Sequence, residues 1–347
     1  MDTPESETIG ILRLPNEILI QILQFHPADS GIFALSTSCR RLHYLALPVY
    51  LAAHGIPDTS ALASQDLVLL PNQLDTVLVA LQTALFIPSL KLKHISCAFA
   101  LDSASIQYSF IPIRTRRDLF FRHLRRLAGF LSKLEQVDEV TLDFRDVGFA
   151  LFSQGLGALD TWDSIISALL DASLETGCKT FTVEGGMFLV HSSQFQRNSS
   201  SFRTAVVIKR RSSLMSDLGR RIASAFVRRP DTIQRGIGSG DSESQPQPGG
   251  LRTFNIHSNV LLLRPCYSWT MATLRASPNL VSLSIVCADI PRRNGDDILA
   301  NIHAPGLKYF VMDLDCQVSE AALDQFRARH RHIGPSSFGV QVSFGKR

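Results

Sequence analysis

The sequence has no long hydrophobic run. No apolar stretch in its 347 residues reaches the roughly 18 residues that a membrane-spanning helix needs, so we expect no membrane partner. The first seven residues include three acids and no basic residue, which is the opposite of a secretory signal. These two absences favour a protein that works in the cytoplasm, the nucleus or both.

Paired cysteines and a strong excess of one charge are also missing. The six cysteines are far apart and none stands in a Cys-x-x-Cys motif, which is typical of reduced, buried thiols in an intracellular protein. The formal net charge is +4, with 35 Lys and Arg against 31 Asp and Glu. This excess is too small to indicate a partner made of nucleic acid.

The usual catalytic and nucleotide-binding motifs do not occur. There is no Gly-x-Ser-x-Gly elbow, no Gly-Lys-Ser/Thr loop and no His-Glu-x-x-His pair. Cys316, His330 and His332 are conceivable metal ligands, but structural zinc sites have tighter paired spacing, so a core thiol and two solvated histidines are the better interpretation. Asp143 and Asp146 flank a strand end, where turn-forming Asp is common. We expect no enzyme activity, no cofactor and no metal.

What the sequence does contain is a clear helical pattern over residues 12–50. Pro15 suits the first turn of a helix, where its missing N–H has no partner to lose, and Glu17 follows where the helix dipole favours an anion. A second short helix is expected around residues 32–35, and a third that Pro48 and then His54 and Gly55 close. Three short helices cannot bury this much apolar surface by themselves, so part of it should face a partner.

This stretch resembles an F-box. The resemblance is carried by Leu14-Pro15, the acid at position 17, the Ile/Leu run that follows, and Leu35-x-x-x-Cys39-Arg40-Arg41-Leu42. Leu42 stands where the family often has Trp, and Tyr50 falls near a second common Trp.

The resemblance implies a function in protein ubiquitination. An F-box binds a Skp-type linker protein and, through it, a cullin, in a ubiquitin ligase complex. The residues carried over by position for the linker contact are Leu14, Pro15, Ile18, Leu19, Ile22, Leu35, Cys39, Arg40 and Leu42. The alternative is an ordinary amphipathic three-helix segment that packs on the domain that follows.

A repeated strand pattern occupies the rest of the chain. The clear copies are Leu251-x-x-Phe254-x-Ile256, Leu280-x-x-Leu283-x-Ile285 and Leu307-x-x-Phe310-x-Met312, and looser copies begin at Leu92, Val137 and Cys178. Helical spacing appears between most copies, at residues 119–131 and 162–170, and again at 323–326 after the last clear copy. Strand–helix alternation of this kind predicts a curved parallel sheet with helices on its convex side. The pattern resembles the degenerate leucine-rich repeats that often follow a fungal-type F-box.

The expected fold is therefore α/β, a three-helix F-box followed by an irregular leucine-rich-repeat-like solenoid. The predicted organisation is a disordered N-terminus at 1–11, the F-box at 12–55, and a substrate-binding repeat domain at 56–347. A helix is expected within residues 55–90, ended by Pro88. Residues 231–250 are almost free of apolar side chains, so they should form a disordered loop.

Two surfaces are candidates for binding a protein target. Alternate strand residues point away from the core, and in the clear copies these are Thr253, Asn255, Ser282, Ser284, Tyr309 and Val311. Tyr309 is the expected anchor, with Asn255 and Ser284 beside it. The competing surface is a basic stretch that contains Arg210 and Arg211, although cations on an amphipathic helix are usually just solvent-facing.

Together these patterns predict a substrate-recognition adaptor of a Skp–cullin–F-box ubiquitin ligase. It would hold a target near another protein's catalytic centre, which is catalysis by proximity. The alternative is a repeat scaffold that mediates protein–protein interaction without any part in ubiquitination. The sequence does not identify the target.

Overall fold

The fold is described from a computed structural model. It describes residues 11–25, 30–56, 62, 66–85, 90–100, 112–147, 157–186, 250–262, 266–286, 292–312, 318–334 and 338–340. Residues 1–195 and 247–347 belong to one structural unit, and every described residue lies in that unit. Arg210, Arg211, the first ten residues and the predicted loop up to residue 249 lie outside the described residues.

The N-terminal segment folds into helices close to those expected. A short 3-10 turn, η1 (Ile11–Arg13), precedes α1 (Asn16–Phe25), α2 (Ser30–Ser38) and α3 (Arg40–Ala53). The predicted end of the third helix at His54 and Gly55 is confirmed, because α3 ends at Ala53 with His54 as its C-cap, whereas Pro48 does not close the helix, which continues through it. Buried residues on both sides of the proline, Leu47 and Leu51, hold the helix against the core at the cost of one backbone hydrogen bond. The chain leaves α3 at Gly55, whose φ of +93° suits glycine.

The helix expected within residues 55–90 is present but short, and it ends at Thr83 rather than at Pro88. The chain forms a strand, β1 (Asp66–Leu69), then η3 (Pro71–Gln73) and a short helix, α4 (Val77–Thr83). The four residues of β1 alternate between exposed and buried and pair with the next strand, which a helical pattern search does not detect.

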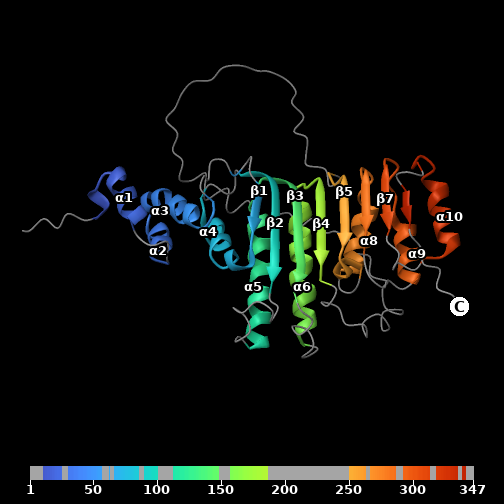
Figure 1. Ribbon diagram of the computed structural model, residues 1–347, viewed down its shortest axis with the longest axis horizontal. Helices are drawn as coiled ribbons and strands as arrows, with labels where there is room; N and C mark the ends of the chain where they lie inside the picture. Colours follow the sequence, from blue (N-terminus) through green and yellow to red (C-terminus); the bar gives the residue numbers. More distant parts are fainter. Residues whose placement is uncertain are drawn as a thin grey trace, which may run out of the picture. The chain divides into compact units, whose positions relative to one another are not determined.

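The sheet has eight parallel strands in sequence order (Figure 1). After β1 they are β2 (Lys91–Ala100), β3 (Gln136–Asp146), β4 (Thr180–Gly185), β5 (Thr253–His257), β6 (Ser282–Ile285), β7 (Tyr309–Met312) and β8 (Phe338–Val340). The six predicted strand segments are confirmed, and their matching positions pair in register along the row Ile95, Val140, Phe181, Phe254, Leu283 and Phe310.

Helices cover one face of this sheet (Figure 1). They are α5 (Ile113–Leu131), α6 (Gly157–Glu175), α8 (Tyr267–Arg275), α9 (Arg292–Asn301) and α10 (Glu320–Arg329), with the 3-10 turn η8 (Asn259–Leu262) after β5. Three of the helices pack an aromatic ring against the ring of a strand residue. These ring pairs are Phe120–Phe144, Phe181–Trp269 and Phe310–Phe326, with centroids 6.3, 6.1 and 4.5 Å apart. The strand residues of these pairs point to the same face of the sheet. Right-handed crossovers between sequential parallel strands place the connecting helices on that one face. The predicted mixed α/β class is confirmed.

One buried core runs through the described residues from α1 to α10. It includes Tyr50 and Leu51 of α3 and Ile56 just after it, together with Leu67 of β1 and Leu74 before α4. The predicted boundary near residue 55 therefore does not coincide with a gap in the core. Successive side chains of the strands point alternately into this core and toward the opposite face of the sheet. No helix that the structure describes covers that opposite face, which we call the open face (Figure 1).

Candidate interaction surfaces

Helix α1 carries an apolar stripe that the rest of the described chain does not cover. Ile18 and Ile22 are each 42% exposed and Phe25 is 91% exposed, although all three are large and apolar. Their spacing of four and three residues places them on one side of the helix. Leu19 and Leu23, which lie on the other side, are buried. Ile11 and Leu12 in η1 are also about half exposed, so the apolar surface extends beyond α1.

Arg41 of α3 holds the start of α1 in place. Its guanidinium donates to the side-chain carbonyl of Asn16 at 3.0 and 2.7 Å and to the backbone carbonyl of Leu14 at 2.6 Å, and it also contacts the carbonyl of Leu12. The predicted contact residue Arg40 is its neighbour but points elsewhere, with its guanidinium 5.9 Å from the ring centroid of Tyr44. Arg41 therefore makes contacts within the fold, whereas the adjacent Arg40 is an exposed cation.

The nine predicted linker-contact residues fall into three groups by burial. Pro15, Ile18, Ile22 and Arg40 are exposed, Leu14, Leu35 and Cys39 are partly buried, and Leu19 and Leu42 are buried. The two buried leucines cannot touch a partner in this arrangement, so their role is to support the helices. Sequence reasoning missed Phe25, Ile11 and Leu12. The signal for Phe25 was its position seven residues after Ile18, on the same side of the helix.

The open face of the sheet carries all six predicted outward-pointing residues. The strand register aligns Thr253 with Ser282 and Tyr309, and Asn255 with Ser284 and Val311. Asn255 donates from Nδ2 to the hydroxyl of Thr182 at 3.0 Å, and Nε2 of His257 lies 2.9 Å from the hydroxyl of Ser284. Asn255 and Ser284 are thus partly engaged within the face. Tyr309, at 55% exposed, presents the largest free side chain of the six.

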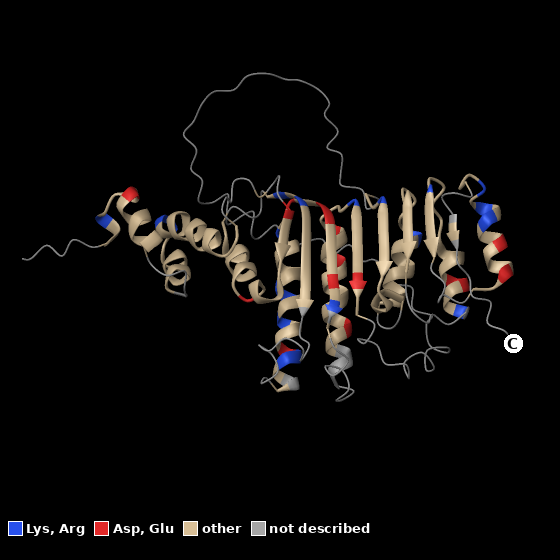
Figure 2. Cartoon of the chain, in the orientation of Figure 1, with Lys and Arg blue, Asp and Glu red and all other residues tan. Residues whose placement is uncertain are grey.

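Charge on the open face changes from one half of the sheet to the other (Figure 2). Over β1 to β4 the face carries the acids Asp66, Glu139, Asp143 and Glu184, while Lys91 and Lys93 at the start of β2 are exposed bases. Arg145 partly neutralises this half, since it lies 2.5 Å from Asp143 and 3.5 Å from Glu184. At the starts of β4, β5 and β7 the charged residues are basic instead.

A row of Asp66, His94 and Thr141 looks superficially like a nucleophile with its base. The ring nitrogens of His94 lie 3.8 Å from an Asp66 carboxylate oxygen and 3.4 Å from the Thr141 hydroxyl. These residues lie within strands whose backbones pair with one another, Asp66 at the first position of β1. Acyl transfer needs free donors for the developing oxyanion, and a paired ladder offers none there. The row does not assemble a catalytic site.

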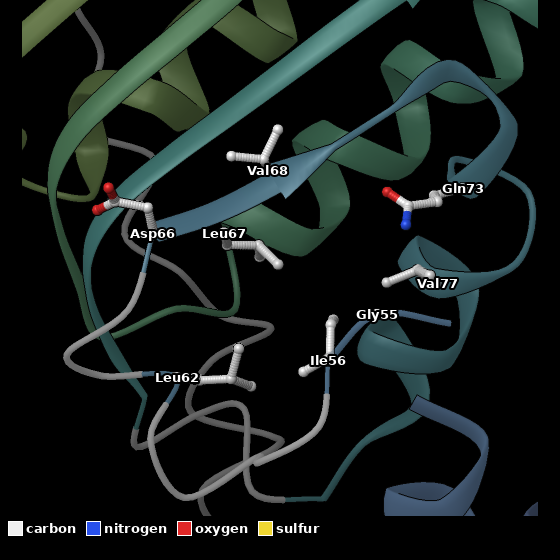
Figure 3. Close-up of a pocket in the computed structure, with 8 residues that line it drawn as sticks. All are labelled: Gly55, Ile56, Leu62, Asp66, Leu67, Val68, Gln73 and Val77. Atoms are coloured by element: carbon white, nitrogen blue, oxygen red, sulfur yellow. The ribbon is translucent and has the colours of Figure 1, made fainter. Parts of the chain in front are cut away.

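The described residues enclose one small cavity between the end of α3, β1 and α4 (Figure 3). Its volume is about 140 Å³, and its lining residues are Gly55, Ile56, Leu62, Asp66, Leu67, Val68, Gln73 and Val77. The Gln73 amide is already engaged, because it donates to the His54 carbonyl at 3.0 Å and accepts from the Leu70 N–H at 3.0 Å. Ligand pockets are usually about 300–1,000 Å³ with several converging polar groups. This cavity meets neither condition.

Three of the four described thiols are buried. Cys39, Cys97, Cys178 and Cys266 are free thiols, and burial raises the pKa of Cys178 to about 12. No group of three or more His, Cys, Asp or Glu among the described residues is placed to hold a metal ion. The expectation of two solvated histidines is wrong for His330, which is buried and stacks on Phe326 at 4.5 Å. Cys316 lies outside the described residues.

None of the helices that the structure describes is long and apolar enough to cross a membrane. What the described chain offers to other molecules is therefore the apolar stripe of α1 and the open face of the sheet. No protein-family model matches this chain, and no curated protein matches it closely enough to count as a relative.

Proposed function

We propose that the chain is a substrate-recognition adaptor of a Skp–cullin–F-box ubiquitin ligase. In this proposal α1 to α3 form the F-box and bind a Skp-type linker protein, while an irregular leucine-rich-repeat-like solenoid holds a protein target. The chain performs no chemistry itself, and it acts in the cytoplasm or nucleus by bringing the target close to another protein's active site.

The observation that carries the proposal is the uncovered apolar stripe on α1. Ile18, Ile22 and Phe25 stay exposed although the same helix buries Leu19 and Leu23 against its own fold. Exposed apolar surface of this kind is typical of a binding site, because water contact with it is unfavourable. The stripe lies inside the segment whose residue order resembles an F-box, which supports the choice of a Skp-type linker as its partner.

The sheet supports the second half of the proposal. Six segments with the same residue pattern pair in register, and the helices between them lie on one face. The opposite face stays open and polar, as is needed for a surface that recognises another protein.

The alternative function is a scaffold with no part in ubiquitination, and one observation favours it. Ala46, Leu47 and Leu51 of α3 join the same buried core as Leu67 of β1 and Leu78 of α4. Helices that complete a core in this way can simply cap the end of the sheet. In that case the apolar stripe would bind some other protein.

Co-purification with a Skp-type linker separates the two functions. The wild-type chain should co-purify with the linker, and Ile18→Ser combined with Phe25→Ser should abolish this. Truncation of a central interface residue costs about 2 kcal/mol or more, which is roughly 30-fold in affinity for each position. Both side chains are exposed, so the melting temperature should stay within a few degrees of the wild-type value.

A matched control is available outside the helices. Val68→Ser combined with Leu85→Ser also removes two exposed apolar side chains, each more than half exposed. This variant should still bind the linker. Wild-type yield of the complex with the Ile18 and Phe25 variant would contradict the proposal, and a folded wild-type chain that never binds the linker would favour the scaffold.

A further inference from the structure

A row of basic residues lies at the start of the strands from β4 to β7. Lys179, Arg252 and Lys308 stand just before β4, β5 and β7. Backbone hydrogen bonds make them neighbours across the sheet: the N–H of Arg252 donates to the Lys179 carbonyl at 2.8 Å, the N–H of Val281 to the Arg252 carbonyl at 2.7 Å, and the N–H of Lys308 to the Val281 carbonyl at 2.8 Å. Figure 2 shows basic residues, in blue, at the upper ends of several strands.

Two of the three cations have no acidic partner among the residues that the structure describes. Lys179 forms an ion pair with Asp138 at 2.9 Å. Arg252 and Lys308 are exposed and form no ion pair with any residue that the structure describes. Exposed cations of this kind can bind an external anion without first breaking an internal contact.

On β4 to β7 the side chains that follow this basic row are neutral and carry hydroxyl groups, and Glu139 of β3 stands in register with the first of them, Thr180. Along the open face the following row is Thr180, Thr253, Ser282 and Tyr309, in register. The first acid on these strands is Glu184, at the far end of β4. A hydroxyl can donate a hydrogen bond to a carboxylate or a peptide carbonyl, so this row adds donors beside the cations. The start of the face is thus positive and rich in donors.

The spacing of the cations indicates the form of the anion. Neighbouring strands lie about 4.8 Å apart, so Arg252 and Lys308, two strands apart, are separated by roughly 10 Å at the backbone. One phosphate group does not span that distance. An extended peptide advances about 3.3 Å per residue and points every second side chain the same way, so acids on one side stand about 6.6 or 13 Å apart, within reach of two long cationic side chains.

We propose that the strand starts of β4 to β7 bind an extended, carboxylate-rich segment of the target protein. Arg252 and Lys308 pair with its acids, and Thr253, Ser282 and Tyr309 donate hydrogen bonds to it. The inference relies on the proposed function only in assigning this segment to the target of the adaptor. The charge complementarity stands without it.

The test uses the full chain and a fluorescein-labelled peptide of five Ser-Glu repeats, with binding followed by fluorescence anisotropy. Arg252→Glu combined with Lys308→Glu should weaken binding at least tenfold. Arg122→Glu combined with Arg125→Glu, two exposed positions on α5, makes the same change in net charge and should alter affinity less than twofold. Arg252→Gln with Lys308→Gln should give an intermediate loss with an unchanged melting temperature. Raising the salt to about 1 M, where the Debye length falls to about 3 Å, should abolish binding.

Several results would overturn the proposal. They are no binding at millimolar peptide in low salt, an equal loss in the two charge-reversal pairs, and a loss that only Arg210→Glu with Arg211→Glu produces. Tighter binding of a Ser-Gln peptide with a single phosphoserine would overturn the choice of a carboxylate-rich segment. Linker co-purification is measured in parallel. The Arg252 and Lys308 variants should retain the linker, so failure of this surface is distinguishable from failure of the adaptor function.

Discussion

His123 of α5 is almost fully buried beside a carboxylate. Its Nε2 lies 3.0 Å from Asp75, which precedes α4, and Arg126 pairs with the same carboxylate. Burial lowers the pKa of His123, and Asp75 opposes this only in part. For Asp75, burial acts to raise the pKa, but the hydrogen bonds and charges of His123 and Arg126 outweigh it and the pKa is lowered. The cluster therefore holds a neutral imidazole against an ionised carboxylate, and it joins α5 to the turn before α4.

This arrangement predicts that the fold loses stability as the medium becomes mildly acidic. The pKa values of His123 and His330 are both lowered from 6.5, chiefly by burial. Below about pH 6.5 the unfolded chain binds protons at these sites before the folded chain does, so the free energy of unfolding decreases. The melting temperature should fall between pH 7.5 and pH 5.5. His330→Phe, which can keep the ring contact with Phe326, should reduce that fall, as should His123→Gln. Equal pH dependence in the wild type and both variants would contradict this assignment.

At the scale of a single element, the end of β4 depends on glycine. Gly185 has a φ of +71°, and a Cβ built there would lie 2.4 Å from the backbone nitrogen of Arg145 on β3. Gly177, before the same strand, has a φ of +74° but nothing within 4 Å of the corresponding position. The two glycines therefore share the left-handed backbone and differ in the space around it.

Alanine at these two positions separates the two effects. Gly177→Ala should cost only the left-handed backbone, about 1–2 kcal/mol. Gly185→Ala should add about 1–3 kcal/mol, because the Arg145 backbone must move. Thermal melts of both variants, measured side by side, should show a clearly larger loss at Gly185 than at Gly177. Equal losses would mean that β3 yields easily at this end.

At the scale of the whole molecule, the sheet is continuous although a long insertion separates β4 from β5 in the sequence. β4 ends at Gly185 and β5 begins at Thr253, yet the two strands pair directly in parallel. The chain has to return along only about five residues of strand, roughly 17 Å, so most of the insertion is not needed for the connection.

Deletion of residues 231–249 therefore should not disturb the fold. These residues are nearly free of apolar side chains, so they cannot bury enough surface to offset the entropy of ordering them. Gly250 is kept, because a Cβ there would meet the Gly177 carbonyl at 3.4 Å. With a short Gly/Ser linker in place of the deleted residues, the melting temperature should remain within a few degrees. A fall of more than about 10 °C would show that the segment is structural.

Periodic apolar spacing identified most of the elements from the amino-acid sequence. The strands at Phe254, Leu283 and Phe310 were predictable because their apolar residues recur at every second position. The helices α5 and α6 were predictable because their apolar residues recur three or four positions apart. The position of β1 was not, because four alternating residues are too short a signal without the pairing to β2. The continuation of α3 through Pro48 was not predictable either, because burial around Pro48 outweighs the local preference of proline to end a helix.

The amino-acid sequence by itself determined which residues form the core rows of the sheet and where an apolar helix begins near the N-terminus. Only the tertiary structure decided which side of that helix stays uncovered, since Leu19 is buried by α3 while Ile18 is not. It also decided that Lys179, Arg252 and Lys308, up to 129 residues apart in the chain, stand along one edge of the sheet. The physical reason is that spacing along the chain records local geometry, whereas exposure and charge grouping depend on strands that pair across long insertions.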